Sequence, residues 1–372
     1  VMCLLTSLKN KTNTYKISAG GGASLIFQSS TPAIGYGYNF GLHEISGNFL
    51  YSGTFHVLDD KVDLNDLGYL DRNNQVRYNF NATYQNYDVQ GKISSYSWST
   101  DFEQSYLYNP NVWQEFWFNS SFDLAFTSNI NCGVNIFSKP FSFYDYYEPR
   151  VWGRKYKHIG FLYGSIYAST NSNKPVFVSA NIGYGESKNP DDPYIDGGVD
   201  PYFVLNDHVQ IGLHSNFSIN NKDYGFADFD SNGNIIYGQR NLYDLTNGIS
   251  FQYNVNSKMN LKFTARDYYF KVQYTNFYFL NADGSLTQNN YSGDYDLNVN
   301  LFNIDCVYNW QIAPGSYLNL IWKNNISHLD NRSVESYLNN LNRTMKEPQS
   351  NMLSLKLIYY LDYSSIFNQQ KG

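Results

Sequence analysis

The feature that most constrains this chain is a two-residue alternation of apolar and polar side chains in long segments. In residues 302–312 every even position is apolar, from Phe302 to Ile312, and four of the five odd positions are polar. The same alternation occurs in residues 34–43, 76–85 and 353–363. Because successive side chains of a strand point to opposite faces, the pattern predicts strands with one apolar and one polar face.

The length of these segments points to a membrane. Each runs for about 10 residues, which suits a tilted strand crossing a bilayer and exceeds the usual strand of a soluble protein. The chain is 18% aromatic and 16% charged, with 36 Tyr and 26 Phe. Aromatic girdles and a polar lumen are typical of outer-membrane barrels. The predicted fold is all-β, a transmembrane antiparallel up-and-down β-barrel.

A helical membrane protein is excluded by the hydropathy. The mean hydropathy is −0.47, and no window reaches the roughly 18 consecutive apolar residues that a spanning helix needs. A barrel strand needs apolar residues on alternate positions alone, so a low mean hydropathy is compatible with it.

Short and long connections alternate along the chain, as in barrels with short periplasmic turns and longer extracellular loops. Tight turns are predicted near 46–47, 128–129, 206–207, 256–257 and 314–315, and long loops near 59–74, 139–157, 187–198, 220–236, 281–297 and 328–350. This predicts about 16 strands in a single domain, residues 1–372. The opening Val-Met-Cys-Leu-Leu starts in mid-pattern, so we expect an N-terminally truncated part of a larger barrel.

The alternative is a soluble carbohydrate-binding β protein. Its apolar face should be rich in Val, Ile and Leu, and its outer face in Lys and Glu; here the polar positions are mostly Asn, Ser, Gly, Gln and Thr. A net charge of −6 and a pI near 5.5 argue against a nucleic-acid partner. Outer-membrane lipid is the expected partner.

Candidate binding residues lie in two of the predicted loops. Asp63, Asn65 and Asp66 form part of an acidic cluster that could hold a cation or a sugar, although such residues are usually just solvated. Glu148-Pro149-Arg150 and Arg154 could bind a ligand, and we favour the view that they brace a loop by ion pairs in the barrel mouth.

A weak metal candidate begins at Asp228. Asp228, Asp230 and Asn232 copy the first half of a calcium loop, but its twelfth position is Gln239 in place of a bidentate Glu. We therefore favour a hairpin loop over a metal site.

The sequence contains no His-Glu-x-x-His and no Gly-x-Ser-x-Gly motif, and its three Cys are widely spaced. We expect no catalytic residues and no cofactor, and hence a protein that is not an enzyme.

Three blocks of the sequence carry a family resemblance. They are residues 59–70 followed by Asn73-Asn74, residues 146–154 with Glu148-Pro149-Arg150, and residues 302–363. Together they resemble an uncharacterised Bacteroidota outer-membrane family, whose full-length members join an N-terminal domain similar to family 9 carbohydrate-binding modules to a C-terminal barrel. The resemblance implies location and architecture more than activity, because that module is absent from this chain.

Two functions are compatible with these features. The first is an outer-membrane conduit, receptor or component of an envelope complex, linked to carbohydrate binding or uptake through the missing N-terminal module, with glycans or envelope proteins as partners. The second is a structural membrane anchor that displays an upstream binding or hydrolytic domain. An open channel would need a lumen free of plugs, whereas an anchor could have a filled one.

Overall fold

The protein is almost entirely β structure in a computed structural model that describes residues 2–10, 12, 14–26, 33–62, 72–187 and 192–361. The strands are β1 Met2–Lys9, β2 Tyr15–Ile26, β3 Ala33–Glu44, β4 Phe49–Leu58, β5 Gln75–Asn86, β6 Ile93–Leu107, β7 Trp113–Phe126, β8 Asn131–Lys139, β9 Phe143–Asp145, β10 Tyr156–His158, β11 Phe161–Ser169, β12 Val176–Ser187, β13 Tyr194–Val204, β14 Val209–Phe229, β15 Ile235–Asn256, β16 Met259–Leu280, β17 Leu286–Gln288, β18 Leu297–Ala313, β19 Ser316–Asp330 and β20 Gln349–Ile358. Helix α1, Tyr337–Thr344, lies between β19 and β20.

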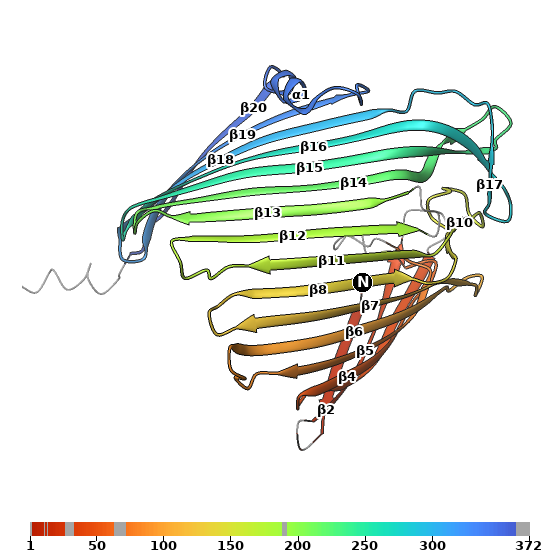
Figure 1. The fold of residues 1–372 in the computed structure, drawn as a ribbon, viewed down its shortest axis with the longest axis horizontal. Helices are drawn as coiled ribbons and strands as arrows, with labels where there is room; N and C mark the ends of the chain where they lie inside the picture. The colour runs from red at the N-terminus through yellow and green to blue at the C-terminus, as the bar shows by residue number, and fades with distance from the viewer. Residues whose placement is uncertain are drawn as a thin grey trace, which may run out of the picture.

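Eighteen of the strands form one antiparallel sheet in which each main strand pairs with the next along the chain (Figure 1). The short strands β9 and β10 form a separate pair within the connection from β8 to β11. The prediction of an all-β, antiparallel up-and-down arrangement is confirmed. The number of strands exceeds the predicted sixteen, partly because of the three-residue β17.

The connections agree closely with the sequence pattern. Short turns join β3 to β4, β7 to β8, β13 to β14, β15 to β16 and β18 to β19, at the five predicted places. The prediction of a long loop at 220–236 is wrong. There β14 and β15 continue as a hairpin up to Phe229 and Ile235, past a register irregularity between Asn220 and Asp223. A bulge allows a strand to continue through residues that read as a polar loop.

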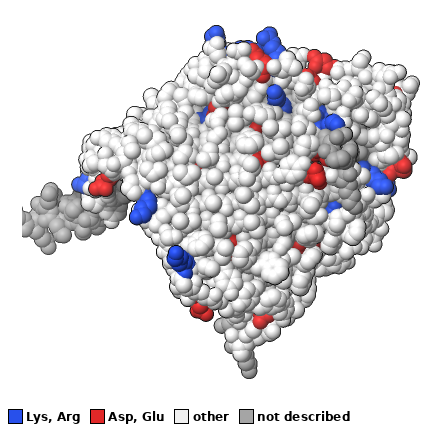
Figure 2. Space-filling model, viewed as in Figure 1, with Lys and Arg blue, Asp and Glu red and all other residues white. Residues whose placement is uncertain are grey.

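One face of the sheet is apolar across the strands, and we call it the apolar face. In register, it carries Ile17, Phe40, Phe55, Phe80, Trp98, Phe122, Ile136, Ile166, Ile182, Val199, Leu213, Ile249, Phe263, Tyr308, Leu320 and Leu355. Many of these side chains are exposed, including Trp98 at 58% and Ile166 at 57%. Figure 2 shows a broad expanse without charge, with charged side chains mostly toward its rim.

The opposite face, which we call the polar face, carries the alternate residues. They include Asn81, Asp101, Asn119, Asn135, Tyr163, Asp196, Arg266, Asp305 and Lys323. Hydrogen bonds and ion pairs join neighbouring strands on this face: Asn81 donates to Asp101 at 2.8 Å, and Arg266 lies 3.1 Å from Asp305. Many side chains of the apolar face are thus exposed, whereas polar side chains of neighbouring strands contact one another on the polar face.

The two outermost strands of the meander are β1 and β20. Among the described residues, β1 pairs with β2 and β20 with β19, and no pairing joins β1 to β20, so a closed barrel is not seen. Both strands run toward the end of the sheet that carries the short turns. The two edges are therefore parallel in direction.

Candidate functional site

Residues 140–160 connect β8 to β11 at the long-loop end of the sheet, and we call this segment the mouth loop. Its first part is a tight turn in which the Asp145 carboxylate accepts hydrogen bonds from the backbone N–H groups of Tyr147 (2.7 Å) and Glu148 (3.0 Å). Arg150 has a φ of 57°, in the left-handed region. Since Pro149 is fully buried, the Glu-Pro-Arg turn is held in a single conformation.

The mouth loop contacts distant parts of the sheet. On one side, the Tyr147 hydroxyl donates to the carbonyl oxygen of Asn73 at 3.0 Å, just before β5. On the other, the Glu148 carboxylate accepts a hydrogen bond from the backbone N–H of Phe226 in β14, at 2.9 Å. Further along, the Arg154 guanidinium donates to the carbonyl oxygen of Leu280 at the end of β16.

These contacts require a strongly curved sheet. Seven neighbouring strand pairs separate β5 from β14, which in a flat sheet at about 4.8 Å per pair would lie roughly 33 Å apart. Tyr147 and Glu148 are consecutive residues, so their partners must be brought together by curvature. The mouth loop therefore crosses the concave side of the sheet. Glu148 of the loop contacts Arg240, which lies on the same face of β15 as Asp244 and thus on the polar face, so the polar face is the concave one.

An ion-pair chain fixes the loop to β14 and β15. The Glu148 carboxylate lies 3.5 Å from the Arg240 guanidinium, which in turn donates to the Asp223 carboxylate at 2.6 Å. These side chains are 22–31% exposed, so their attraction is less screened than at an open surface. Arg150 stacks over Phe226 at 4.4 Å. Glu148, Arg150 and Arg154 thus all contact other parts of the chain, in the arrangement that a bracing role requires.

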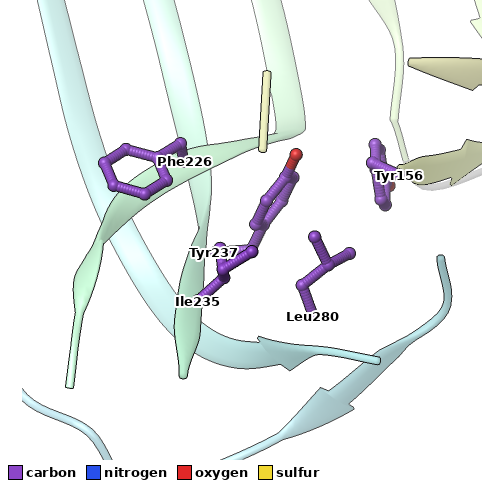
Figure 3. Close-up of a cluster of buried hydrophobic side chains, with 5 residues drawn as sticks. All are labelled: Tyr156, Phe226, Ile235, Tyr237 and Leu280. Carbon is purple, nitrogen blue, oxygen red and sulfur yellow. The ribbon is translucent and has the colours of Figure 1, made fainter. Parts of the chain in front are cut away.

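A cluster of buried apolar side chains supports this end of the molecule. It contains Tyr156, Phe226, Ile235, Tyr237 and Leu280 (Figure 3). The rings of Tyr156 and Tyr237 lie 5.0 Å apart, and the Tyr237 hydroxyl is buried without a hydrogen-bond partner. Burial raises the pKa of Tyr156 well above its usual value. The cluster packs one end of the mouth loop against β14, β15 and β16.

His158 is held in the same region in its neutral form. Its ring stacks on Phe143 at 4.5 Å and meets Tyr156 edge-on at 4.4 Å. Burial lowers its pKa to about 4, against the favourable charge of Asp145. A neutral imidazole between two rings contributes packing to the loop, and protonation would disturb that packing.

A pocket of about 400 Å³ opens beside the mouth loop, and we call it the loop-end pocket. Aromatic and charged side chains from four parts of the chain line it: Tyr156, Lys157, His158, Asp192, Lys222, Asp223, Tyr224 and Tyr278. The Tyr224 hydroxyl accepts a hydrogen bond from Gln239 at 2.7 Å. Rings beside carboxylates and ammonium groups can stack on a sugar ring and hydrogen bond to its hydroxyls.

The carboxylates of the candidate calcium residues Asp228 and Asp230 have different hydrogen-bond partners. The Asp228 carboxylate accepts hydrogen bonds from the hydroxyls of Tyr291 and Tyr295, and these bonds lower its pKa. The Asp230 carboxylate accepts from the backbone of Asn232 and Asn234 in the hairpin turn. Among the described residues no group of three His, Cys, Asp or Glu side chains could hold a metal ion.

The other candidate binding residues, Asp63, Asn65 and Asp66, lie outside the described residues. Their described neighbour Asp59 is buried, and its carboxylate accepts hydrogen bonds from the backbone N–H groups of Tyr36, Lys61 and Val62. Asp59 therefore organises the start of this loop.

Sequence reasoning missed Asp192, Lys222, Asp223, Tyr224 and Arg240. Each is an ordinary polar or aromatic residue in a polar stretch, and their spacing matches no known motif. They meet because the strands curve and the mouth loop crosses them, so no local signal could have identified them.

A family model matches residues 1–370, nearly the whole chain. The chain belongs to the family described as Domain of unknown function (DUF5916). The matched range includes the residues of the apolar face, the mouth loop and α1. Its description assigns no activity.

No curated protein matches the chain. Within the described part of the chain, no helix combines the length and apolarity needed to cross a membrane.

Proposed function

We propose that this chain forms most of an outer-membrane β-barrel that acts as a conduit or receptor, with its apolar face toward lipid and its polar face toward a hydrated interior. The observation that carries the proposal is the reversed polarity of the sheet. A soluble protein buries its apolar face and exposes its polar one. Here the apolar face lies on the convex side and is exposed, whereas the polar face lies on the concave side with its groups hydrogen-bonded.

Strand edges give a second argument. In hydrocarbon every backbone N–H and C=O must have a partner, so the free edges of β1 and β20 must be paired. Since the two strands run in the same direction, an odd number of further strands between them would close the sheet in a fully antiparallel way. Such a barrel has an even number of strands, as is usual for single-chain bacterial barrels.

The mouth loop gives the long-loop end of the barrel its proposed role, which is to restrict the opening. It crosses the concave side and is fixed by Glu148, Arg240 and Arg154, so it narrows the opening on the extracellular side. The loop-end pocket beside it is the proposed point of contact for a glycan. A Bacteroidota origin and an N-terminal carbohydrate-binding-like module, both implied by the resemblance, are part of this proposal. We propose no enzymatic activity and no cofactor.

Outer-membrane assembly is tested first. Outer-membrane fractions of the full-length protein are run on gels without boiling and after boiling. We expect a detergent-dependent species whose mobility shifts on boiling. A species that is soluble without detergent and does not shift would contradict the membrane assignment and favour a soluble carbohydrate-binding protein.

Glycan contact is tested in planar bilayers with maltohexaose as the probe. A conduit predicts steady conductance with brief blocks by the sugar, and Tyr278→Ala in the loop-end pocket should shorten the blocks. Tyr184→Ala, on the apolar face, is the control. A folded protein in the membrane that carries no current would contradict the conduit and favour the alternative, a structural anchor displaying an upstream domain.

A further inference from the structure

Helix α1 is oriented with its polar side toward the sheet. Asn340 and Thr344 on its inner side are fully buried, whereas Leu338 on the helix is 72% exposed and Val334, which precedes the helix, is 81% exposed. Met345, the residue that caps the C-terminal end of the helix, is also exposed. A helix at a water-facing surface normally shows the opposite arrangement. Leu338 in α1, Val334 before it and Met345 at its end are thus apolar side chains that the described residues do not cover, beside the exposed Asn339 and Asn342 of the helix.

An amide network holds the polar side in place. The Asn340 side chain exchanges four hydrogen bonds of 2.7–3.2 Å with the side chains of Asn298 and Asn300 in β18. All three side chains are buried, with exposures of 2% or less. The Tyr337 hydroxyl donates to the Asp267 carboxylate at 2.7 Å. These contacts restrict rotation of the helix about its own axis.

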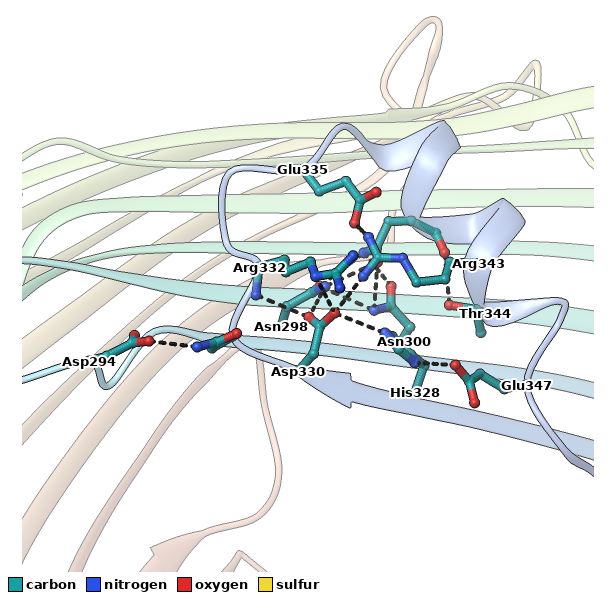
Figure 4. Close-up of polar contacts among 12 residues, drawn as sticks. Asp294, Asn298, Asn300, His328, Asp330, Arg332, Glu335, Arg343, Thr344 and Glu347 are labelled. Carbon is teal, nitrogen blue, oxygen red and sulfur yellow. Dashed lines mark hydrogen bonds and ion pairs between the residues drawn. The ribbon is translucent and has the colours of Figure 1, made fainter.

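A charged cluster fixes the segment that carries the helix (Figure 4). The Asp330 carboxylate accepts a hydrogen bond from Arg343 and lies 3.0 Å from His328. His328 lies 2.9 Å from the Glu347 carboxylate, beyond the end of the helix. The C-terminal end of α1 is therefore tied to β19.

Helix α1 lies at the border of the apolar face, at the start of β18. Its contacts Asn298 and Asn300 lie on the same face as Phe302, which begins the apolar run of β18. Below this border the neighbouring β20 presents Leu353, 71% exposed, followed by Leu355 and Leu357. The outward side chains of α1 thus continue the apolar face upward.

We propose that α1 is an interfacial helix that, with the residues flanking it, inserts Leu338, Val334 and Met345 into the outer edge of the lipid bilayer. This inference rests on the proposed membrane function. Amphipathic helices in this position bury their apolar side about 5–10 Å deep at the boundary of headgroups and acyl chains. The exposed Arg332 and Lys346 flank the apolar side chains and would meet the anionic phosphates of the lipids. Lipid is favoured as occupant because the surface is continuous with the apolar face.

The experiment uses single cysteines in a background in which the three native Cys are replaced by Ala. An NBD fluorophore is attached at Leu338→Cys, at Leu353→Cys on the apolar face and at Asn232→Cys in the exposed 230–234 turn. The protein is placed in vesicles of phosphatidylcholine and phosphatidylglycerol. Quenching by lipids with nitroxides at a shallow or a deep position is compared with quenching by aqueous iodide.

We expect shallow nitroxides to quench the label at Leu338 several-fold more than iodide, deep nitroxides to quench the label at Leu353, and iodide to quench the label at Asn232. Met345→Cys, on the same side of the helix, should repeat the result of Leu338→Cys. Iodide quenching at Leu338 with lipid quenching at Leu353 would overturn the helix inference and leave the membrane proposal standing.

Two other results are also decisive. Iodide quenching at both positions would overturn the membrane proposal, and this inference with it. Protection of Leu338 from both quenchers would show that protein covers the helix, which overturns lipid as the occupant.

Discussion

The Tyr147 hydroxyl donates a hydrogen bond to the carbonyl oxygen of Asn73, which lies 74 positions earlier in the chain, while the next residue, Glu148, accepts one from Phe226 in β14. Two consecutive residues therefore link strands that are far apart in the sheet. This relation requires a strongly curved sheet, and it places the mouth loop across the concave side.

Releasing the mouth loop should open the concave side. In Glu148→Gln the attraction to Arg240 is lost, and Arg240 keeps Asp223 alone as its charged partner. Because removing one partner of a partly buried pair leaves the other charge less compensated, we expect a cost of about 1–3 kcal/mol. Limited proteolysis should cut residues 140–160 several-fold faster, and the conductance should rise. Asp207→Asn, in an exposed short turn, is the control; an unchanged cleavage rate would show that the pair does not hold the loop.

Low pH should loosen the same loop through His158. Burial lowers the pKa of His158 to about 4 in the folded protein, against an ordinary value of 6.5. Between pH 6.5 and pH 4, His158 binds a proton in the unfolded loop more readily than in the folded loop. The stability of the folded loop is therefore unaffected above pH 6.5 and falls as the pH drops toward 4. The total loss is about 3 kcal/mol.

The readout is amide exchange at Lys157, whose N–H donates to the carbonyl oxygen of Gly284 at 2.9 Å. In His158→Phe the ring can still stack on Phe143 but does not titrate, so its exchange should lack this part of the pH dependence. Identical pH profiles for the two proteins would rule out His158 as the cause.

Opposite faces of β18 should respond differently to a charge. Tyr308 lies on the apolar face between Leu261 and Leu320, and Asn309 lies on the polar face. Tyr308→Arg should cost about 2–4 kcal/mol if it faces the middle of the bilayer, and Asn309→Arg should be mild. Urea unfolding of the protein in lipid vesicles measures both. Equal effects would contradict the assignment of the two faces.

The amide network under α1 should be sensitive to a change of a single side chain. Asn340→Leu removes four hydrogen bonds and leaves the buried amides of Asn298 and Asn300 short of partners, so we expect a loss of about 2–4 kcal/mol and faster amide exchange in residues 331–348. Asn339→Leu is the matched control, since Asn339 is exposed on the same helix. If both variants exchange at the native rate, the network does not anchor the helix.

The strands, their two faces and most of the connections could be predicted from the residue pattern. Alternation with a period of two residues follows from the local geometry of a strand. The pattern in residues 302–312 therefore predicts both the strand and the composition of each of its faces. Gly, Pro, Asn and Ser in the short turns are equally local signals. The extended hairpin of β14 and β15 was not predicted, because residues 220–223 are polar like a loop. The structure has a register irregularity there, and the strand continues beyond it.

The contacts between residues far apart in the sequence could not be predicted from the residue pattern and follow from the tertiary structure. Glu148 and Arg150 were identified as candidates for bracing, but their partners Arg240 and Phe226 follow from the curvature of the sheet, which sums small twists over many strands and leaves no mark in residue spacing. The same holds for α1. Its apolar side faces outward because Asn340 finds Asn298 and Asn300 beneath it, and that match depends on the register of β18, set by the whole sheet.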